Sequence, residues 1–425
     1  MKINKRTLTI TIILGVFVLF IAGILVAVNF QNLKPHLKVA FYDLNDTEKN
    51  ALTKELETFT NKKGKKLLYR FTELNSSAEL ETQLQKKKYD IVFTQLGKDA
   101  EDAAQHFGEK KNIAFATTVL DGTTISIHQA ALYNKSGSVS ALPLLIDHHE
   151  IDIDRTVLAQ YGIKTIATWN DIESFAVKAQ KNIKSPIVFA GGDGETFLGI
   201  FGALVESLSG REAYDSAAAT IQEATAEALK KGTPLTSIEY STLIKNLSEK
   251  EGTPFYAATR TLSRWYKKGL LNSETFNMTP DDVTAFMEAK NAAVCFMTLS
   301  QHRNIEHEII ERYSSIYYPS ERVASLRYFT APLVCAIPLS KNANAHWAIQ
   351  KLVSAEVQES LSREAGLAPV QANCRVADHQ ADDVRYWVAA TNSPLPSFGK
   401  KVFSGGASLK IFAGELGSYI RFLPQ

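Results

Sequence analysis

The chain has 425 residues, of which 45% are hydrophobic and 22% charged, and this composition excludes both a disordered protein and a polytopic membrane protein. Three of its 47 basic side chains lie in the first six residues, which leaves 44 against 45 acidic side chains in the remainder. This balance, without a basic stripe, argues against a nucleic-acid-binding protein, and the length suits two domains or one bilobed body.

The cysteines Cys295, Cys335 and Cys374 are widely spaced and form no CxxC pair. Their odd number and their spacing indicate neither a disulfide framework nor a structural zinc site. Cys295 and Cys335 stand within apolar runs, so we expect them to be buried core thiols.

The N-terminal segment combines three basic side chains with an uncharged run, Thr7–Leu33. The apolar part of this run, residues 8–28, is long enough to cross about 30 Å of hydrocarbon as a helix. No clean small-x-small cleavage site and no lipid-accepting cysteine follow it. Residues 1–33 are therefore predicted to be a transmembrane signal anchor, with a cleaved signal as the alternative. The basic flank places the globular body on the extracytoplasmic, or periplasmic, side of the inner or cytoplasmic membrane.

Strand and helix patterns alternate from residue 37 onward. Leu37–Asp43, "KKLLYRFTEL" and the apolar Tyr89–Leu96 have strand patterns, and the segments between them carry leucines at helical spacing. The order strand–helix–strand–helix–strand predicts an α/β unit with a parallel sheet. From Ile113 to Pro143 the pattern changes to short strands.

The stretch "ATWNDIESFAVKAQ", Ala167–Gln180, predicts a helix with one apolar stripe at positions i, i+3, i+4 and i+7. Thr168 is suited to its N-cap, and Asp171 three residues later completes a capping box. Trp169 at the first helical position is interpreted as a packing residue rather than as a platform for ligand.

The remaining segments continue this alternation. Ser185–Gly210 predicts a strand, a glycine-rich turn and an apolar helix, and residues 211–250 have a helical composition. A helix and a strand over Asp281–Thr298, a strand at Ala331–Leu339 and a long helix that stops at Gly366 complete the pattern.

Four stretches, in the expected order, resemble the sugar-binding type of extracellular solute-binding protein that serves ABC transporters, family 1. "YGIKTIATWNDI" resembles the Thr-Trp-acid helix start of that family, although Ile166 and Ala167 stand where prolines are usual. "AFMEAKNAAVCFMT" resembles its helix-to-strand segment, with Ala289 in place of a glycine. The opening "KVAFYDLND" with "YDIVFTQ", and the later "APLVCAIPLSKNANAHWAIQKLV", are the other two. The resemblance covers residues 37–425.

The resemblance implies an α/β, bilobed, periplasmic-binding-protein-like fold of type II, in which ligand binds between two lobes that close about hinge segments. It implies crossings between the lobes near Pro143–Asp147, Ala292–Thr298 and Thr330–Cys335. The lobes implied by these crossings are residues 37–143 plus 299–332 for lobe one, and 144–297 plus 333–425 for lobe two.

The implied function is capture of a small ligand, a sugar or oligosaccharide, and its delivery to the permease subunits of an ABC transporter. Such a binder needs no catalytic group, cofactor or metal, and the chain lacks GxSxG and HExxH motifs. All four tryptophans lie in helical patterns, so a peptide, a polyol or a small anion stays open as the ligand.

Two alternative functions also stay open. One is a membrane-tethered sensor or scaffold on the same fold. The other is a metal-dependent hydrolase built on "DHHEIDID", Asp147–Asp154. In a strand, His148 and Glu150 of this segment share one face, and Asp147 and His149 share the other.

Ligand groups in this fold lie at strand ends and helix starts, where backbone N–H groups point outward. The candidates from that rule are Tyr42, Asp43, Asn45, Gln95, Asp147, Glu195, Thr196, Ser300 and Gln301. The aromatic candidates are Phe398 and Phe403, because the resembling family often places a late aromatic there for stacking on a sugar. Asp43 and Asn45 could instead cap the next helix, and Asp147 could instead fix the hinge.

Overall fold

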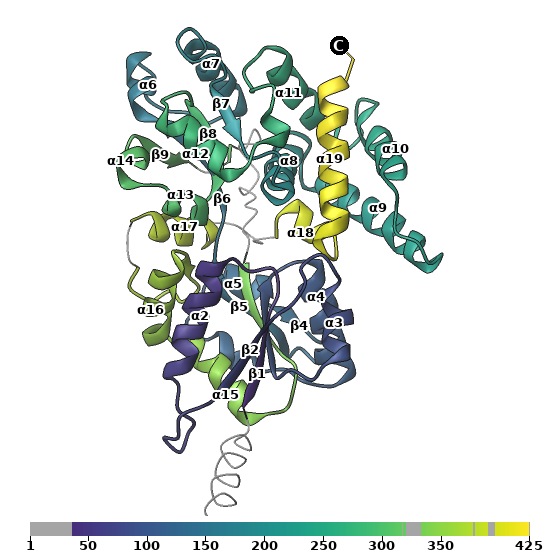
Figure 1. Cartoon of the computed structure of the whole chain (residues 1–425), viewed down its shortest axis with the longest axis vertical. Coiled ribbons are helices and arrows are strands. Elements are labelled where there is room, and N and C mark those ends of the chain that lie inside the picture. The colour runs from purple at the N-terminus through teal and green to yellow at the C-terminus, as the bar shows by residue number, and fades with distance from the viewer. Residues whose placement is uncertain (1–35, 317, 320–332, 377–378, 390–395, 425) are drawn as a thin grey trace, which may run out of the picture.

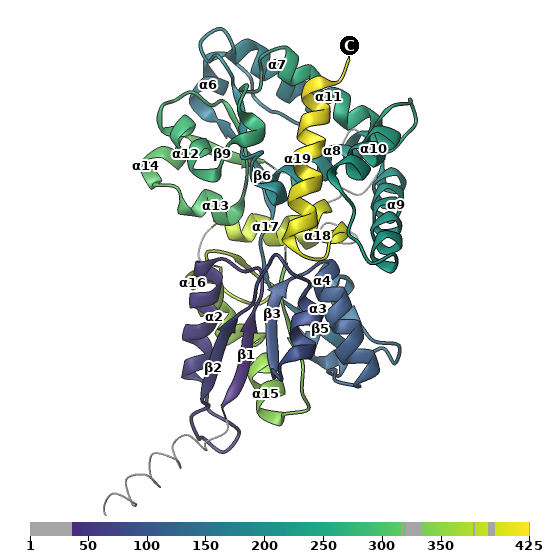
Figure 2. The same ribbon diagram turned by 45° about the vertical axis from the view of Figure 1, so that its right-hand side comes forward.

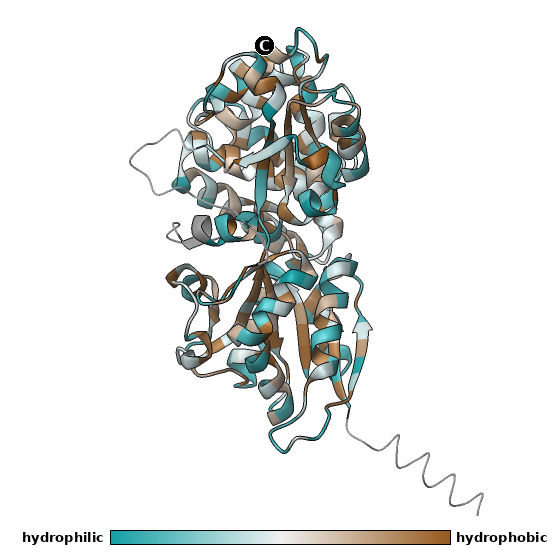
Figure 3. Cartoon of the chain, turned by 90° about the vertical axis from the view of Figure 1, so that its left-hand side faces the viewer, coloured by the Kyte–Doolittle hydropathy of each residue, from teal (hydrophilic) through white to brown (hydrophobic). Residues whose placement is uncertain are grey.

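The computed structural model describes residues 36–316, 318–319, 333–376, 379–389 and 396–424, which form two α/β lobes stacked along the long axis (Figure 1). Each lobe has its own sheet and its own hydrophobic core, and a turned view shows the two lobes one above the other (Figure 2). Figure 3 shows hydrophobic strands in the lower lobe enclosed by helices of mixed polarity. The predicted bilobed α/β architecture is therefore confirmed.

The sheet of lobe one has the strand order β11-β5-β10-β3-β1-β2, with β4 beside β5. β1 runs parallel to β2 and β3, as the opening strand–helix alternation predicted, whereas β10 runs antiparallel to β3 and β5. The strands are β1 (Leu37–Phe41), β2 (Tyr69–Glu73), β3 (Ile91–Gln95), β4 (Leu132–Tyr133), β5 (Val139–Ile146), β10 (Leu333–Pro338) and β11 (Ala368–Pro369).

Helices pack against this sheet through the leucines that occur at helical spacing in the sequence. Leu52 and Leu56 of α2 are buried, as are Leu80 and Leu84 of α3. The helical segments of lobe one are α2 (Asp46–Thr58), α3 (Leu80–Lys86), α4 (Lys98–Ala104) with the π-helical turn Gln105–Lys110, the 3-10 turn Thr117–Leu120, α5 (Ile125–Ala130), α15 (Ala343–Leu352), α16 (Ala355–Ala365) and α17 (His379–Ala389).

Lobe two contains a second sheet with the order β7-β8-β6-β9, built from β6 (His149–Asp154), β7 (Ile187–Phe189), β8 (Val294–Thr298) and β9 (Tyr313–Ile316). β6 is antiparallel to both β8 and β9, and β7 is parallel to β8. The helical segments of lobe two are α6 (Arg155–Gln160), α7 (Trp169–Ala179), α8 (Gly194–Ser209), α9 (Arg211–Lys230), α10 (Ser237–Ser248), α11 (Tyr256–Lys267), the 3-10 turn Thr275–Asn277, α12 (Pro280–Glu288), α13 (Leu299–Asn304), α14 (His307–Ile310), α18 (Phe398–Val402) and α19 (Gly406–Phe422).

The start of α7 confirms the predicted capping box. Thr168 Oγ1 accepts from the Asp171 N–H at 3.0 Å, and Asp171 Oδ2 accepts from the Thr168 N–H at 3.0 Å. Trp169 is only 3% exposed and donates its indole N–H to Ser207 Oγ at 2.6 Å, so its predicted packing role is also confirmed. This helix is held in lobe two by the side chain that begins it.

A single carboxylate ties α7 to α11. Glu173 accepts hydrogen bonds from Arg264 and Lys268, at 2.8 and 2.7 Å, and from the Trp265 indole at 2.9 Å. Partial burial opposes ionisation of Glu173, but these bonds outweigh it and hold its pKa at about 2. The carboxylate is therefore ionised at neutral pH and keeps the two helices in register.

The lobe boundaries differ from those predicted. β10, α15, α16, β11 and α17 lie in lobe one, so the assignment of residues 333–425 to lobe two is wrong for these elements. β9 pairs with β6, and α13 and α14 pack on β8 and α12, so the assignment of residues 299–332 to lobe one is wrong for these three elements. A short apolar strand carries no mark of its partner in its own sequence, because either sheet can accept it.

The first predicted crossing agrees with the structure, since β5 ends at Ile146 in one sheet and β6 begins at His149 in the other. The crossing predicted at Ala292–Thr298 is wrong, because β8 lies inside the lobe-two sheet, between β7 and β6. The chain instead returns to lobe one between β9 and β10, near the third predicted crossing, and enters lobe two again between α17 and α18. Residues 320–332 and 390–395 of these stretches lie outside the described residues.

The predicted membrane anchor, residues 1–33, lies outside the described residues. Within the part of the chain that the structure describes, no helix is both long enough and apolar enough to span a bilayer. Cys295, Cys335 and Cys374 are buried and free of disulfide bonds, and the burial of Cys295 and Cys335 confirms the prediction from their apolar surroundings.

Candidate functional site

The two lobes touch through α18 and the turn that follows it, residues 397–406 (Figures 1 and 2). The Lys400 ammonium forms an ion pair with the Asp43 carboxylate of lobe one, and its Nζ lies 3.9 Å from Glu195 Oε2 of lobe two. Burial lowers the pKa of Lys400 to about 8. Burial, with the neighbouring Asp193 carboxylate, raises the pKa of Glu195 well above its usual value. One cation thus stands between carboxyl groups of both lobes.

Two backbone hydrogen bonds join the same turn to lobe one. The Gly406 N–H donates to the Ser76 carbonyl at 2.8 Å, and the Gly405 N–H donates to Asp99 Oδ2 at 2.8 Å. Gly405 has a φ of +78°, a left-handed conformation that glycine adopts without strain. The glycine therefore turns the chain so that consecutive N–H groups face lobe one.

Beside this contact, a cavity of about 380 Å³ lies between the lobes. Its volume falls within the range of about 300–1,000 Å³ that is usual for small-molecule sites. Lobe one contributes the chain before and within α3 and the start of α4, and lobe two contributes α9 and the α18–α19 turn. The polar and aromatic lining residues are Ser77, Glu79, Glu81, Lys98, Asp99, Asp102, Gln222, Thr225, Phe403, Ser404 and Ser408.

Asp99 is the most firmly held carboxylate of the cavity wall. It accepts from the Tyr42 hydroxyl at 3.0 Å, from the Leu80 N–H at 3.1 Å and from the Gly405 N–H. Burial raises the pKa of Asp99 in spite of these hydrogen bonds, and burial with the Asp99 charge raises the pKa of Tyr42. Asp99 therefore supports the lobe contact and has few lone pairs left for a ligand.

Other carboxylates of the wall are less committed to the protein. Asp102 pairs with Lys98 and accepts from the Ser404 hydroxyl at 3.0 Å, so it also reaches across the lobes. Glu79 is exposed, and it accepts a hydrogen bond from the Thr82 hydroxyl at 3.2 Å. Glu79 is thus the lining carboxylate with the most freedom to accept hydrogen bonds from a ligand.

The predicted residues of lobe one have different roles in the structure. Tyr42 and Asp43 lie at the lobe contact, where Asp43 has a φ of +56° and pairs with Lys400. Asn45 caps α2 through a capping box with Glu48, which is the capping role that the sequence left open. Gln95 Oε1 is buried and has no hydrogen-bond partner among the described residues. Asp43 and Gln95 therefore remain candidates for ligand contact.

The predicted residues near the hinge bond mainly to one another. Asp147 is buried and accepts from the His148 N–H at 2.8 Å, the Ser300 N–H at 3.2 Å and the Ser300 hydroxyl at 2.7 Å. Burial raises the pKa of Asp147. Gln301 caps α13 and donates to Thr196 Oγ1 at 3.4 Å. These contacts favour the hinge role of Asp147 over direct contact with a ligand.

The two predicted aromatic residues pack in the core of lobe two. Phe398 is 0% exposed and meets the Tyr214 and Phe255 rings edge to face. Phe403 is 3% exposed and packs on Tyr240, although some of its atoms line the cavity. The core contacts of Phe398 argue against its stacking on a sugar.

Most cavity residues were not among the sequence candidates. Phe403 is shared by both sets, and Asp99 and Asp102 lie in the first turns of the helix that follows β3. The rule that ligand groups lie at helix starts could have included these acids, because they come four and seven residues after Gln95, at the start of α4. Gln222 and Ser404 have no such local signal, since only the approach of the lobes brings them there.

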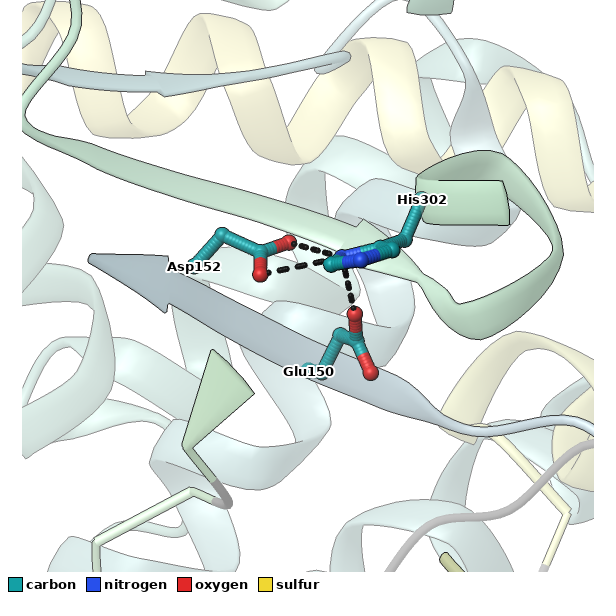
Figure 4. Close-up of side chains that lie close together, drawn as sticks. All are labelled: Glu150, Asp152 and His302. Carbon is teal, nitrogen blue, oxygen red and sulfur yellow. Dashed lines mark hydrogen bonds and ion pairs between the residues drawn. The ribbon is translucent and has the colours of Figure 1, made fainter. Parts of the chain in front are cut away.

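A second polar cluster lies inside lobe two (Figure 4). His302 Nδ1 is 2.8 Å from Glu150 Oε1 and 3.1 and 3.2 Å from the two carboxylate oxygens of Asp152. Candidate metal ligands from these three residues lie within 4.8 Å of one another, and both carboxylates are completely buried. The sequence marked "DHHEIDID" but did not include His302, which comes from α13 about 150 residues later.

The electrostatics of this cluster follow from the shared imidazole. Burial opposes charge on His302, but hydrogen bonds and attraction from Asp152 and Glu150 outweigh it and raise its pKa to about 10. Burial and the neighbouring Glu150 charge raise the pKa of Asp152 to about 6. Without a bound ion, an imidazolium therefore stands between the two carboxyl groups.

No family model matches the sequence, and no curated protein matches it. Solved structures match nearly the whole chain. The bacterial solute receptor AcbH, described as exclusively preferring β-D-galactopyranose, matches with a TM-score of 0.64 at 12% identity over 90% of this chain and 98% of that chain. An open conformation of the binding protein MsmE from Bacillus subtilis matches with a TM-score of 0.63 at 14% identity, over 91% of this chain and 93% of that chain. A chitin oligosaccharide binding protein matches with a TM-score of 0.60 at 14% identity, over 91% of this chain and 100% of that chain.

At these identities the likeness establishes the fold. The chain has the two-lobed α/β fold of bacterial solute receptors, and this result supports the resemblance found in the sequence.

Proposed function

We propose that this protein is an extracytoplasmic receptor that captures a sugar or oligosaccharide between its lobes and delivers it to the permease subunits of an ABC transporter. The observation that carries the proposal is the cavity of about 380 Å³ that both lobes line. The shared fold supports it, because solved proteins of this shape include receptors for β-D-galactopyranose and for chitin oligosaccharide. These neighbours are binding proteins, so binding without catalysis is the role that we infer.

The chemistry of the cavity suits a ligand rich in hydroxyl groups. Carboxylates such as Glu79 accept hydrogen bonds from hydroxyl groups, and a primary amide can both donate and accept. Gln222 already donates from Nε2 to the Lys401 carbonyl at 2.7 Å, which leaves its Oε1 oxygen as an acceptor. Val402 and Phe403 line the same space with apolar atoms, which suit the C–H faces of a sugar ring.

Ligand exchange in this arrangement requires the lobe contact to open. Lys400, Ser404 and Gly405 all bond to lobe one, through Asp43, Asp102 and Asp99 respectively. Hinge motion about the crossing segments would part these bonds and widen the cavity. We propose that closure on ligand re-forms them.

Sugar binding should depend on Glu79. A ligand present at 100 times its dissociation constant should stabilise the protein by about 2.7 kcal/mol, so a melting screen against monosaccharides, polyols and oligosaccharides identifies the ligand. Glu79→Ala should then weaken binding by about tenfold or more, since a charge-assisted hydrogen bond contributes about 1.5–3 kcal/mol.

The matched control is Glu223→Ala, an exposed carboxylate on α9 that does not line the cavity. Calorimetric titration of both variants should show the loss for Glu79→Ala alone. Equal affinity in the wild type and in Glu79→Ala would place the ligand elsewhere, and a screen without any stabilising sugar would count against a carbohydrate receptor.

We further propose that residues 1–33 hold the receptor at the membrane, with the lobes outside the cytoplasm. The uncharged run Thr7–Leu33 behind a basic flank supports this placement. The native protein should fractionate with membranes and resist extraction by high salt. N-terminal sequencing that began near Asn29 would instead show a cleaved signal.

A further inference from the structure

Side chains alternate between the two faces of strand β6, and those on one face include several that can bind a metal ion. His148, directly before the strand, and Glu150 and Asp152 within it stand two residues apart, so all three point to the same side. His302 of α13 meets this stripe, and its Nδ1 lies between both carboxylates (Figure 4). His148 Nε2 lies 2.9 Å from the second oxygen of Glu150. Two imidazoles and two carboxylates thus converge in the interior of the protein.

Two distances in this cluster are close to the spacing of ligand atoms in a tetrahedral metal site. Zinc bonds of about 2.0–2.1 Å to nitrogen and oxygen place tetrahedral ligand atoms about 3.3 Å apart. His302 Nδ1 lies 2.8 Å from Glu150 Oε1 and 3.1 Å from Asp152 Oδ1. Candidate ligand atoms of all three residues lie within 4.8 Å of one another, so movement of these side chains alone would bring them to the spacing that an ion requires.

The charge of the cluster favours a cation as well. Buried carboxylates are normally paired with a cation or coordinate a metal. Glu150 and Asp152 are fully buried, and among the described residues no lysine or arginine side chain pairs with either of them. Arg312 pairs with Asp154, the next residue on this face of the strand, at 2.6 Å. Among the described residues, the side chains that form ion pairs with these two carboxylates are the imidazoles of His148 and His302, and imidazole is itself a common metal ligand.

Outer groups orient these ligands as a metal site requires. The Ser315 hydroxyl lies 3.1 Å from oxygens of both Glu150 and Asp152, and the Gln380 amide donates to Glu150 Oε1 at 2.9 Å. Such partners fix the orientation of ligating carboxylates. Gln380 belongs to α17 of lobe one, so the cluster also connects the two lobes next to the first crossing.

We propose that Glu150, Asp152 and His302 bind one divalent transition-metal ion, with Zn²⁺ as the preferred ion. One nitrogen and two carboxylate ligands suit Zn²⁺ or Co²⁺, whereas Ca²⁺ and Mg²⁺ prefer oxygen ligands alone. The ion would join β6 to α13 and, through Gln380, support the hinge. The proposal does not depend on the sugar-binding function, because the cavity lies at a different part of the lobe contact.

The test uses the full chain, purified without a histidine tag and stripped with a chelator. Titration calorimetry with Zn²⁺ should show one equivalent bound, and Zn²⁺ but not Mg²⁺ should raise the melting temperature. Co²⁺ should give the visible absorption bands of a four-coordinate site. His302→Gln should weaken Zn²⁺ binding by about a hundredfold or more, since even outer groups of metal sites matter by about 10–100-fold.

The matched control is His307→Gln, an 88% exposed histidine on α14, which should leave binding unchanged. If His302→Gln does not fold, Asp152→Asn replaces it in the same titration. The proposal is overturned if the folded, stripped wild type binds no stoichiometric Zn²⁺, or if the ion remains equally tight in a folded His302→Gln or Asp152→Asn variant.

Discussion

Replacing Asp147 by alanine is expected to lower the free energy of unfolding by about 3 kcal/mol and to leave sugar affinity unchanged. Asp147 accepts three hydrogen bonds where the chain crosses between the lobes, from the His148 N–H, the Ser300 N–H and the Ser300 hydroxyl. A buried donor that loses its acceptor costs about 1–3 kcal/mol. Against a total stability of about 5–15 kcal/mol, this loss is large.

Asp147→Asn is the matched variant. The asparagine keeps one carbonyl oxygen, which can accept from the His148 and Ser300 N–H groups as Asp147 Oδ1 does. It also removes the cost of a buried carboxylate. Melting curves should therefore place Asp147→Asn near the wild type and Asp147→Ala well below it. An unchanged melting temperature beside weakened sugar binding would instead put Asp147 in the ligand site.

The second large effect is expected for Trp169→Ala, which should destabilise lobe two by about 3–5 kcal/mol, the usual cost of truncating a buried aromatic. The Trp169 ring centroid lies 6.2 Å from those of Trp265 and Phe296 and 5.7 Å from that of Tyr318. Its loss removes both this packing and the hydrogen bond to Ser207. Denaturant unfolding measures the change.

Two control variants are useful. One separates the packing of the Trp169 ring from its hydrogen bond, and the other measures the loss of a different tryptophan. Trp169→Phe keeps most ring contacts and loses the indole donor, so a smaller cost of about 1 kcal/mol is expected. Trp347→Ala removes a partly buried tryptophan of lobe one, whose indole donates to the Thr60 carbonyl at 2.9 Å, and should also cost less. If Trp169→Ala keeps its stability but loses sugar affinity, the ring is a ligand platform and the packing interpretation fails.

Much of the fold could be predicted because its signals are local. The capping box of Thr168 and Asp171 and the buried leucines of α2 depend on residues three or four positions apart. The membership of β10 could not be predicted in this way. Its apolar sequence fits a central strand in either lobe, and its neighbours β3 and β5 are more than 180 residues away along the chain.

The candidate site was less predictable than the fold. Asn45 and Asp147 follow strands, as ligand groups do, but both side chains are used by the nearest backbone and hydroxyl donors. Polar residues at helix starts serve caps and hinges as readily as ligands. Lys400 and Gln222 gave no local signal, although both reach the space where the lobes meet.

The sequence by itself determined the alternation of strands and helices, their caps and the buried stripe of α7. These features arise from backbone geometry and from hydrogen bonds within one or two turns, which act before the chain has a tertiary structure. Only the tertiary structure decided that β10 joins lobe one, that Lys400 meets Asp43 and that His302 meets Glu150 and Asp152. Each of these contacts joins residues 150 or more positions apart, and its formation depends on how whole sheets and lobes pack against one another.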